Sequence, residues 1–302
     1  MFTSTVALYQ NEMNKAANIN TFKVSDFAAQ VKTVGGSEAN RCKYPARLDT
    51  YGCGCAHNCA YCYARSLLEF RGLWNPRYPK VTDYDKMKRI IAKTKTGSVL
   101  RLGGMTDCFQ PVEERSRATW KAIKWLNQKG IHYLIVTKSD LVASPLYTDL
   151  MDKNLAHIQV SITSTDPAKS RAIENAPLPE RRIAAAERLQ ELGFDTAVRL
   201  SPFIPGMYDF DIINSIQCDK VLVEFLRVNA WIRKWLGGDF PAHTHTEGGY
   251  DHLPLERKKY YLSKITGFKQ ISVCEDVATH YAYWKNNVNH NPDDCCNLTL
   301  KM

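Results

Sequence analysis

The chain has 302 residues, 44% of them hydrophobic, and its 40 lysines and arginines outnumber 31 acidic residues to give a net charge of +9. This length and apolar content suffice for one large core, whereas no apolar run approaches the roughly 20 residues of a membrane helix, which excludes a membrane-spanning protein. The first residues lack the basic flank and apolar core of a secretion signal, so we expect a cytoplasmic protein whose ten cysteines stay reduced.

Short β-rich segments alternate with helical ones along the chain. The helical segments 112–128 and 180–192 carry apolar residues at helical spacing, and Gly130 and Gly193 follow them where helices commonly end. This alternation indicates a parallel sheet with crossover helices, and six such units predict an α/β fold built as a partial (βα)6 TIM-like barrel. The predicted strands are 47–52, 98–103, 131–137, 156–163, 194–200 and 219–223.

Three cysteines, Cys55, Cys59 and Cys62, follow the first predicted strand with C-x3-C-x2-C spacing. They can bind three irons of a [4Fe-4S] cluster and leave the fourth iron without a protein ligand. Such an iron can chelate S-adenosylmethionine and pass one electron to its sulfonium, which produces a carbon radical. The alternative is a zinc-containing nucleic-acid-binding protein, in which Cys53 supplies a fourth thiolate.

Four further motifs accompany the cysteines in the same order along the chain. Together they resemble the signature of the radical S-adenosylmethionine (SAM) superfamily, most closely its spore photoproduct lyase-like branch. The resemblance implies a radical SAM core barrel at 45–225, between an N-terminal extension at 1–44 and a C-terminal cap or lid at 226–302, which is rich in Trp and Tyr. The motifs are LGGMTDCFQPVE (102–113), IVTKS (135–139), VSIT (160–163) and RLSPFIPG (199–206).

Reactive residues of such barrels lie at the carboxyl ends of the strands, where every motif falls. Glycines there let the backbone approach a ligand closely, and the resemblance implies that Gly103 and Gly104 contact the methionine amino group. The resemblance also implies that Lys138 and Ser161 contact SAM. It also implies a one-electron reductant such as flavodoxin or ferredoxin. Further cofactor-binding residues implied by the resemblance are Thr106 and Arg199.

The expected catalytic residues flank the cluster and the second strand. Tyr61 and Tyr63 match two family tyrosines implicated in radical relay. Where the family has a hydrogen-donating cysteine, this chain has Met105, whose thioether has no S–H group. Cys108 is the candidate replacement if its loop turns inward; otherwise it is a small buried thiol. An isomerase or lyase reaction is therefore expected in place of faithful photoproduct repair.

Basic residues are concentrated between Arg65 and Arg101, with ten lysines or arginines against three acids and several aromatic residues. Such a segment can bind phosphates and stack an extruded base, so we expect DNA as the partner and a thymine or modified thymine as the substrate. The alternatives are a solvated helix face at 83–95 and a peptide or small metabolite as substrate. The predicted DNA-binding residues are Arg71, Lys86, Lys88, Arg89 and Lys93.

The last cysteines allow a second metal centre. Cys274, Cys295 and Cys296 could hold an auxiliary cluster together with Cys218 or an acid such as Asp294. Against this stands the adjacency of Cys295 and Cys296, which is cramped for two ligands of one cubane.

Overall fold

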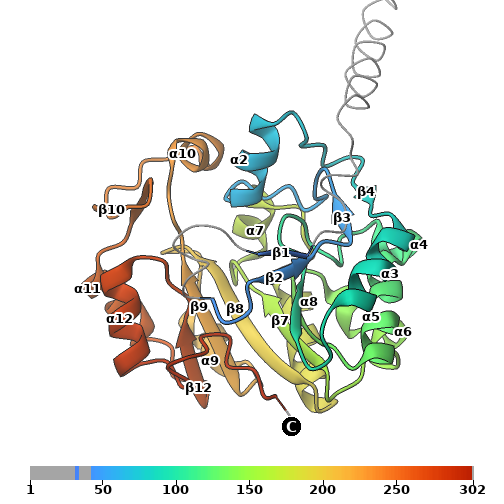
Figure 1. The fold of residues 1–302 in the computed structure, drawn as a ribbon. Helices are drawn as coiled ribbons and strands as arrows, with labels where there is room; N and C mark the ends of the chain where they lie inside the picture. Colours follow the sequence, from blue (N-terminus) through green and yellow to red (C-terminus); the bar gives the residue numbers. More distant parts are fainter. Residues whose placement is uncertain (1–30, 34–41, 301–302) are drawn as a thin grey trace, which may run out of the picture.

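The computed structural model describes residues 31–33 and 42–300. Its main feature is an eight-stranded sheet with the order β1-β2-β5-β6-β7-β8-β9-β12, which curves into a partial barrel (Figure 1). Seven strands are parallel, and β1 (Val31–Thr33) pairs antiparallel with β2. The parallel strands are β2 (Ala46–Leu48), β5 (Val99–Leu102), β6 (His132–Thr137), β7 (Ala156–Ser161), β8 (Asp195–Phe203), β9 (Lys220–Phe225) and β12 (Gln270–Val273).

Burial of the central strands explains their composition. Every residue of β7 is buried, as expected for a parallel strand covered on both faces. Two of its polar members have charged partners, because Arg199 donates to Gln159 Oε1 at 2.7 Å and His157 lies 2.6 Å from Asp195. The partial barrel expected from the alternating pattern is confirmed.

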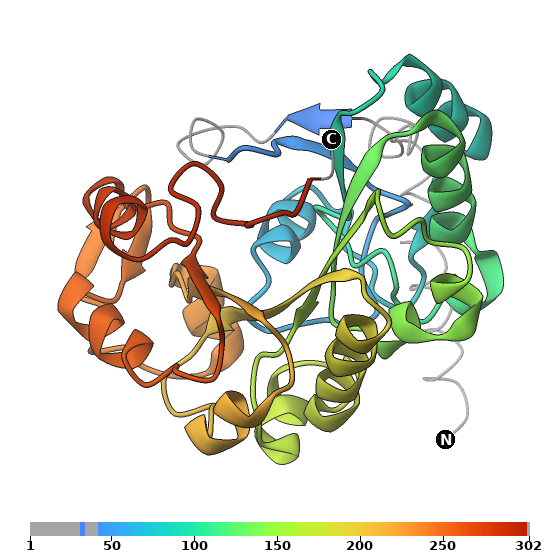
Figure 2. The ribbon, with the colours of Figure 1, turned by 90° about the horizontal axis from the view of Figure 1, so that it is seen from below.

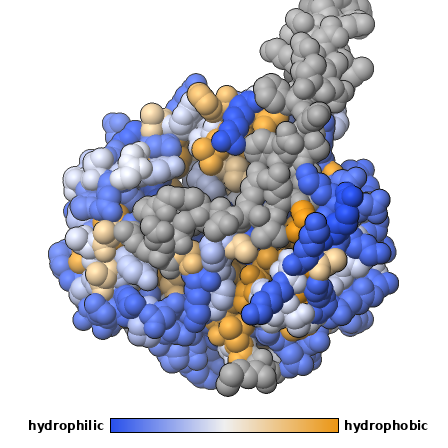
Figure 3. Space-filling view, viewed as in Figure 1, coloured by the Kyte–Doolittle hydropathy of each residue, from blue (hydrophilic) through white to orange (hydrophobic). Residues whose placement is uncertain are grey.

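Helices cover the outside of the sheet, as the view from below shows (Figure 2). On the face seen in Figure 3, hydrophilic side chains cover the edges of the molecule and apolar ones gather toward the middle. Among the described residues, no helix is both long and apolar enough to cross a membrane. The helices of this part are α2 (Tyr63–Phe70), α3 (Tyr84–Lys93), α4 (Glu113–Ser116), α5 (Ala118–Lys129), the 3-10 helix η3 (Asp140–Ala143), α6 (Pro145–Thr148), α7 (Pro167–Ile173), α8 (Pro179–Glu191) and α9 (Phe210–Ser215).

Two predicted elements are divided in the structure. The strand expected at 47–52 is β2 followed by β3 (Tyr51–Gly52), which leaves the main sheet to pair with β4 (Lys80–Val81). The helix expected at 112–128 is broken between α4 and α5, where Arg117 has a φ of 52°. Neither break interrupts the apolar pattern, so the sequence signal does not reveal it.

The described C-terminal part, from residue 226 to residue 300, adds a strand to the main sheet. β12 pairs in parallel with β9 and adds a seventh parallel strand to the sheet. The segment after α12 then runs back toward β2, across the gap between the two edges of the sheet (Figure 2). Within the expected N-terminal extension, residues 1–30 and 34–41 lie outside the described part. The other elements of the C-terminal part are α10 (Ala230–Leu236), the hairpin of β10 (His245–Glu247) and β11 (Tyr250–His252), α11 (Leu255–Leu262) and α12 (Ala278–Asn287).

Candidate active site

The loop between β3 and α2 brings three thiols together. Gly54 makes this loop possible, because a Cβ atom there would lie 2.2 Å from the carbonyl oxygen of Asn75. Cys55 and Cys59 are buried, and the charges that act on Cys59 include those of Cys55 and Cys62. Cys53 is also buried, but the charge that acts on its thiol is that of Lys80. The donor set therefore fits a cluster with three protein ligands.

Burial raises the pKa of all three thiols, that of Cys55 to about 12. A buried thiol ionises only beside positive charge, which the irons of a cluster supply. The three thiols therefore suit metal binding better than reaction as free thiolates.

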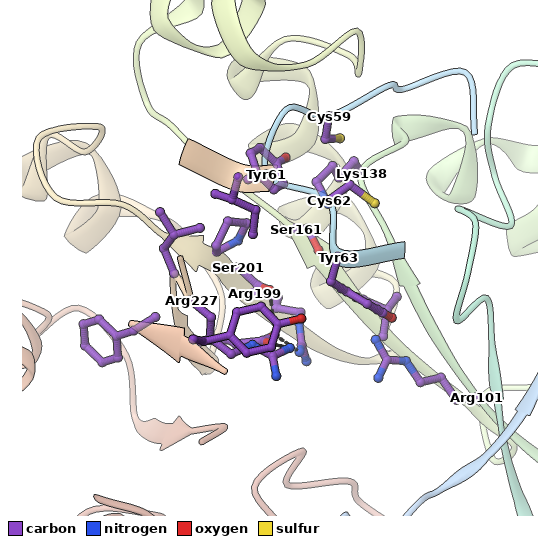
Figure 4. Close-up of a pocket in the computed structure, with 17 residues that line it drawn as sticks. Cys59, Tyr61, Cys62, Tyr63, Arg101, Lys138, Ser161, Arg199, Ser201 and Arg227 are labelled. Atoms are coloured by element: carbon purple, nitrogen blue, oxygen red, sulfur yellow. Dashed lines mark hydrogen bonds and ion pairs between the residues drawn. The ribbon is translucent and has the colours of Figure 1, made fainter. Parts of the chain in front are cut away.

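A pocket adjoins these cysteines at the carboxyl ends of the parallel strands (Figure 4). Cys59, Cys62 and the ring of Tyr61 lie at one side of it, and a group of arginines lies at the other. Besides these two cysteines, the structure places five sequence-predicted residues on this pocket, from the cysteine loop, the start of α2 and the converging ends of β6, β7 and β8. They are Tyr61, Tyr63, Lys138, Ser161 and Arg199.

The loop after β5 lies beside the pocket without lining it. Gly103 has a φ of 78°, and a Cβ atom on Gly104 would lie 2.5 Å from the side chain of Arg47. The amide of Gly104 donates to Asp49 at 2.6 Å, and its carbonyl oxygen accepts from the Tyr63 hydroxyl. Thr106 donates its hydroxyl to the backbone of Tyr51 at 3.0 Å. These contacts fix the loop against the pocket, while the cofactor contacts expected of it stay predictions.

Cys108 is fully buried in the core, where its Sγ lies 3.7 Å from the carbonyl oxygen of Leu102. The Thr119 hydroxyl donates to the Cys108 carbonyl oxygen at 2.6 Å, so the backbone here is held toward α5. The inward turn that a hydrogen donor requires is absent. The structure thus favours the alternative stated for Cys108, a small packed thiol.

Asp107 positions the strand end that carries Lys138. Its carboxylate accepts from the Thr137 hydroxyl at 2.7 Å and from the Lys138 amide at 2.8 Å, and it lies 3.3 Å from His57. Burial alone would raise the pKa of Asp107, but His57 and these hydrogen bonds lower it to about 2. The group is therefore a fixed anion close to the cysteine loop.

Glu174 holds the phenol of Tyr61. This buried carboxylate accepts from the Tyr61 hydroxyl, from Thr163 at 2.5 Å and from Arg182. Burial would raise the pKa of Glu174, but Arg182 and Lys138 lower it. A phenol bonded to a carboxylate can give it a proton when the ring is oxidised, which suits the relay role expected of Tyr61.

Several residues that line the pocket were not predicted as site residues from the sequence. Glu224 bonds Arg199 at 2.5 Å and Ser201 at 2.8 Å, and it lies 3.8 Å from Arg227. Burial would raise the pKa of Glu224, but the two arginines lower it to about 2. Glu224 and Arg227 lie at the end of a predicted strand, so the strand-end rule could have found them. Others that line the pocket are Arg101 and Tyr250.

Arg101 and Arg227 give the pocket its far wall. The guanidinium of Arg227 lies 5.4 Å from the centre of the Tyr250 ring. The Nε atom of Arg101 is buried and has no hydrogen-bond partner within the described part of the chain. These cations face the cysteine side across the pocket (Figure 4). The wall therefore offers positive charge and one aromatic face to a ligand.

The basic helix expected beside the pocket lies elsewhere. α3 packs against α5 in the outer layer (Figure 1), and its last residue, Lys93, precedes the start of β5 at Val99. Its end therefore lies at the amino edge of the sheet, opposite the pocket. Arg71, at the end of α2, is exposed on the pocket side. The structure thus separates Arg71 from Lys86, Lys88, Arg89 and Lys93.

Comparison with solved structures shows the same fold in two proteins. Spore photoproduct lyase complexed with dinucleoside spore photoproduct matches with a TM-score of 0.60 and 14% identity, over 81% of this chain and 79% of that one. SuiB of Streptococcus suis, bound to precursor peptide SuiA, matches with a TM-score of 0.51 and 11% identity, over 94% of this chain and 57% of that one.

Sequence comparison supplies the family. Uncharacterized proteins of Mycobacterium tuberculosis and Mycobacterium bovis are 30% identical over 173 residues, so the chain spans about half the length of these curated relatives: 49% of theirs and 52% of this one. The Radical SAM superfamily matches residues 50–218, more than half of the chain, and these residues include the three cysteines and all the strand-end motifs. The alternative of a structural zinc protein is therefore set aside, and the chain belongs to the radical SAM superfamily.

Proposed function

We propose that this radical SAM enzyme removes a hydrogen atom from a thymine, or from a modified thymine, in DNA, and that rearrangement or bond cleavage follows. The [4Fe-4S] cluster and SAM of the superfamily supply a 5′-deoxyadenosyl radical when bound. The observation that carries the proposal is the pocket itself, where Cys59 and Cys62 face Arg101, Arg227 and the ring of Tyr250. Cationic and aromatic groups in this arrangement suit a nucleotide beside the radical source.

We assign each pocket residue a role according to where it lies in the pocket. We assign the SAM carboxylate to Lys138 and Ser161, which lie on the cysteine side of the pocket. Glu224 compensates the charge of Arg199, so Arg199 contributes to the shape of the pocket more than it attracts anions. Arg101 is assigned to phosphate and Tyr250 to a face of the base. Arg227 is paired with Asp276 at 2.8 Å and lies 3.8 Å from Glu224, so it holds the wall in place more than it attracts anions. Spore photoproduct lyase, which has this fold, binds a dinucleoside photoproduct.

A base must leave the helical stack to reach this pocket. Leu67, Phe70 and Trp231 are exposed on α2 and α10, the two helices that border the opening. Arg65 stacks on Trp235 at 4.1 Å and joins these helices. Exposed apolar and aromatic side chains at an opening can fill the space that an extruded base leaves.

The lack of a hydrogen-donating cysteine among the described pocket residues bears on how the product radical is quenched. Met105 has no S–H group and Cys108 is in the core, so within the described residues the thiols that line the pocket are the cluster ligands Cys59 and Cys62. We infer an isomerase or lyase reaction whose product radical is not quenched by a dedicated cysteine. Tyr61 and Tyr63 line the pocket and are proposed as the relay.

A peptide or small-metabolite substrate is the second candidate. Its support is that SuiB, bound to a precursor peptide, shares the fold, and that the arginine wall also fits carboxylates. The two candidates differ in salt dependence, because binding through several phosphates weakens steeply as salt rises.

The decisive experiment measures 5′-deoxyadenosine formed by anaerobically reconstituted, reduced enzyme, with and without DNA that contains thymine or hydroxymethyluracil-derived bases. We expect DNA to stimulate cleavage of SAM and deuterium from a labelled thymine methyl or methylene group to appear in 5′-deoxyadenosine. Cleavage that is indifferent to DNA, without deuterium transfer, would refute the DNA substrate. Cys59→Ala should abolish cleavage; full activity in this variant would refute the cluster assignment.

Two variants test the DNA surface. Arg71→Gln changes a cation on the pocket side, whereas the combined change of Lys86, Lys88, Arg89 and Lys93 to Gln changes α3. We expect Arg71→Gln to weaken DNA binding and flatten its salt slope, and the α3 variant to do so less, because the end of α3 lies opposite the pocket. Cleavage in the absence of DNA should be unchanged in both. If affinity is unchanged in the α3 variant, its residues are a solvated helix face.

A further inference from the structure

Four thiols outside the active pocket meet in the structure, although they come from distant parts of the chain. Cys274 follows β12, Cys295 and Cys296 follow α12, and Cys42 precedes β2. The charges of Cys274 and Cys296 act on the Cys295 thiol, and the charges that act on Cys42 include those of Cys274 and Cys296. The four thiols therefore form one cluster at the gap between the edges of the sheet.

This group differs from the one expected from the sequence. Cys218 is not part of it, because its Sγ lies 3.6 Å from the Thr196 carbonyl oxygen and 3.7 Å from Gln190. Cys42 takes its place. Nothing in the sequence links Cys42 to the last cysteines, since the contact depends on the C-terminal segment crossing toward β2 (Figure 2).

The buried carboxylate of Asp294 connects two of the segments that carry these thiols. Asp294 accepts from the Tyr44 hydroxyl at 2.6 Å and from the amides of Cys296 and Leu298 at 3.0 and 3.2 Å. It thereby joins the segment that carries Cys42 to the loop that carries Cys296. The backbone of Cys274 is fixed separately, because its amide donates to the Val223 carbonyl oxygen at 2.9 Å. The thiols are therefore placed by a specific network.

Positive charge accompanies the thiols. The positive charges of Arg199 and Arg101 act on the Cys296 thiol, and Arg199 also interacts electrostatically with Cys274. A metal centre with thiolate ligands is anionic, and an anionic group away from water requires nearby cations. Both arginines also line the active pocket, so this group of thiols lies directly behind the pocket wall.

The spacing of the sulfurs suits several irons better than one metal ion. Zinc with 2.3 Å bonds to sulfur holds its ligands about 3.8 Å apart, but in the described chain no three cysteine sulfurs lie within 4.8 Å of one another. The same holds for Cys55, Cys59 and Cys62. In a cuboidal cluster each thiolate binds a different iron, so the sulfurs stand farther apart.

We propose that Cys42, Cys274, Cys295 and Cys296 bind a second iron–sulfur cluster, behind the wall formed by Arg101 and Arg199. Cys295 and Cys296, which are adjacent in the chain, bind two different irons of this cluster. The proposal is independent of the substrate, because it concerns iron that the chain holds without DNA.

The test compares iron, zinc and acid-labile sulfide per chain after anaerobic reconstitution. The variants are C55A/C59A/C62A, which lacks the first site, C42A/C274A, which lacks the second, and a combination of all five changes. Cys218→Ala is the matched control, since it removes a buried cysteine that belongs to neither site. Electron paramagnetic resonance of the reduced proteins, with and without SAM, distinguishes the two clusters.

We expect about eight irons in the unchanged protein and in Cys218→Ala, about four in each single-site variant and none in the combination. The signal of C55A/C59A/C62A should not respond to SAM, whereas that of C42A/C274A should. A folded C55A/C59A/C62A without iron and sulfide, or with zinc in their place, would overturn the proposal. Should C42A/C274A fail to fold, the iron content of C55A/C59A/C62A still decides.

Discussion

Lys138 reaches the pocket from the end of β6, with its Nζ atom 5.5 Å from the centre of the Tyr61 ring. The Lys138 amide bonds Asp107, so the backbone that carries the ammonium group is fixed on the cysteine side of the pocket. A cation held in this way loses little freedom when it binds a carboxylate, which favours tight binding. At the scale of the residue, we therefore propose Lys138 as the chain's main contribution to holding SAM.

Lys138→Met keeps the length of the side chain and removes its charge. We expect the Kd for SAM to rise by about ten- to a hundredfold, because one hydrogen bond to a charged group contributes about 1.5–3 kcal/mol. Isothermal titration of the reconstituted protein measures this change. Lys153→Met, at an exposed position, is the control. An unchanged Kd in Lys138→Met would show that the SAM carboxylate binds elsewhere.

The individual site residues were predictable where a motif and a strand end coincide, as for Lys138, Ser161 and the cysteines. Arg101 and Tyr250 were not, because neither belongs to a motif and Tyr250 reaches the pocket only through the β10–β11 hairpin. Cys108 lies inside a motif, yet the Thr119 hydroxyl holds its backbone toward the core. A tertiary contact of this kind cannot be read from spacing.

At the scale of the element, the break between α4 and α5 depends on one side chain. Glu113 is fully buried, and its carboxylate accepts from the amides of Thr119 and Trp120 at 2.9 Å each, which caps the start of α5. It also accepts from the hydroxyls of Tyr51 and Tyr147. These bonds join β3, α5 and α6 to the break, and they explain why one apolar pattern forms two helices.

Glu113→Ala should lower the free energy of unfolding by about 2–4 kcal/mol, since it removes the cap and leaves buried donors without an acceptor. Urea denaturation followed by circular dichroism measures the loss. The neighbouring Glu114 is exposed, so Glu114→Ala should change stability by no more than about 0.5 kcal/mol. Equal effects of the two changes would contradict the capping role.

At the scale of the whole molecule, Asp195 closes the amino edge of the barrel. It lies at the start of β8, where it bonds His157 of β7 at 2.6 Å and Lys220 of β9 at 2.5 Å. It also accepts from the Thr299 amide at 2.8 Å, which ties the C-terminal segment to the sheet. Burial would raise the pKa of Asp195, but His157 and Lys220 lower it well below its usual value.

A lowered pKa makes this contribution to stability depend on pH. The stabilisation is complete above the ordinary carboxyl pKa of 3.8 and is lost as the pH falls below it. Asp195→Asn should therefore cost on the order of 2 kcal/mol at pH 7, and the difference from the unchanged protein should shrink below about pH 4. Unfolding free energies between pH 7 and pH 3 test this.

The control for Asp195→Asn is Asp219→Asn, which removes an exposed ion pair with Lys269 and should have little effect at any pH. A difference between Asp195→Asn and the unchanged protein that stays constant down to pH 3 would contradict the pKa argument.

The order of the six predicted strands was readable, because each is an apolar run bounded by turn residues. The seventh, β12, was assigned to the cap, since its short run of Gln270–Val273 carries no sign of its neighbour. Its place is set by pairing with β9 and by Asn289, whose side-chain oxygen accepts from the Val273 amide. Long-range pairing of this kind is what local patterns leave open.

The pairing of β12 with β9 has a consequence for biosynthesis. Ribosomes make β9 before β12, so during translation β9 is an unprotected edge strand with an apolar, aggregation-prone face. The gap that the C-terminal segment later crosses is also open at that stage. Nascent chains stalled before Gln270 should therefore depend on chaperones, and cofactor loading has its widest access before synthesis ends.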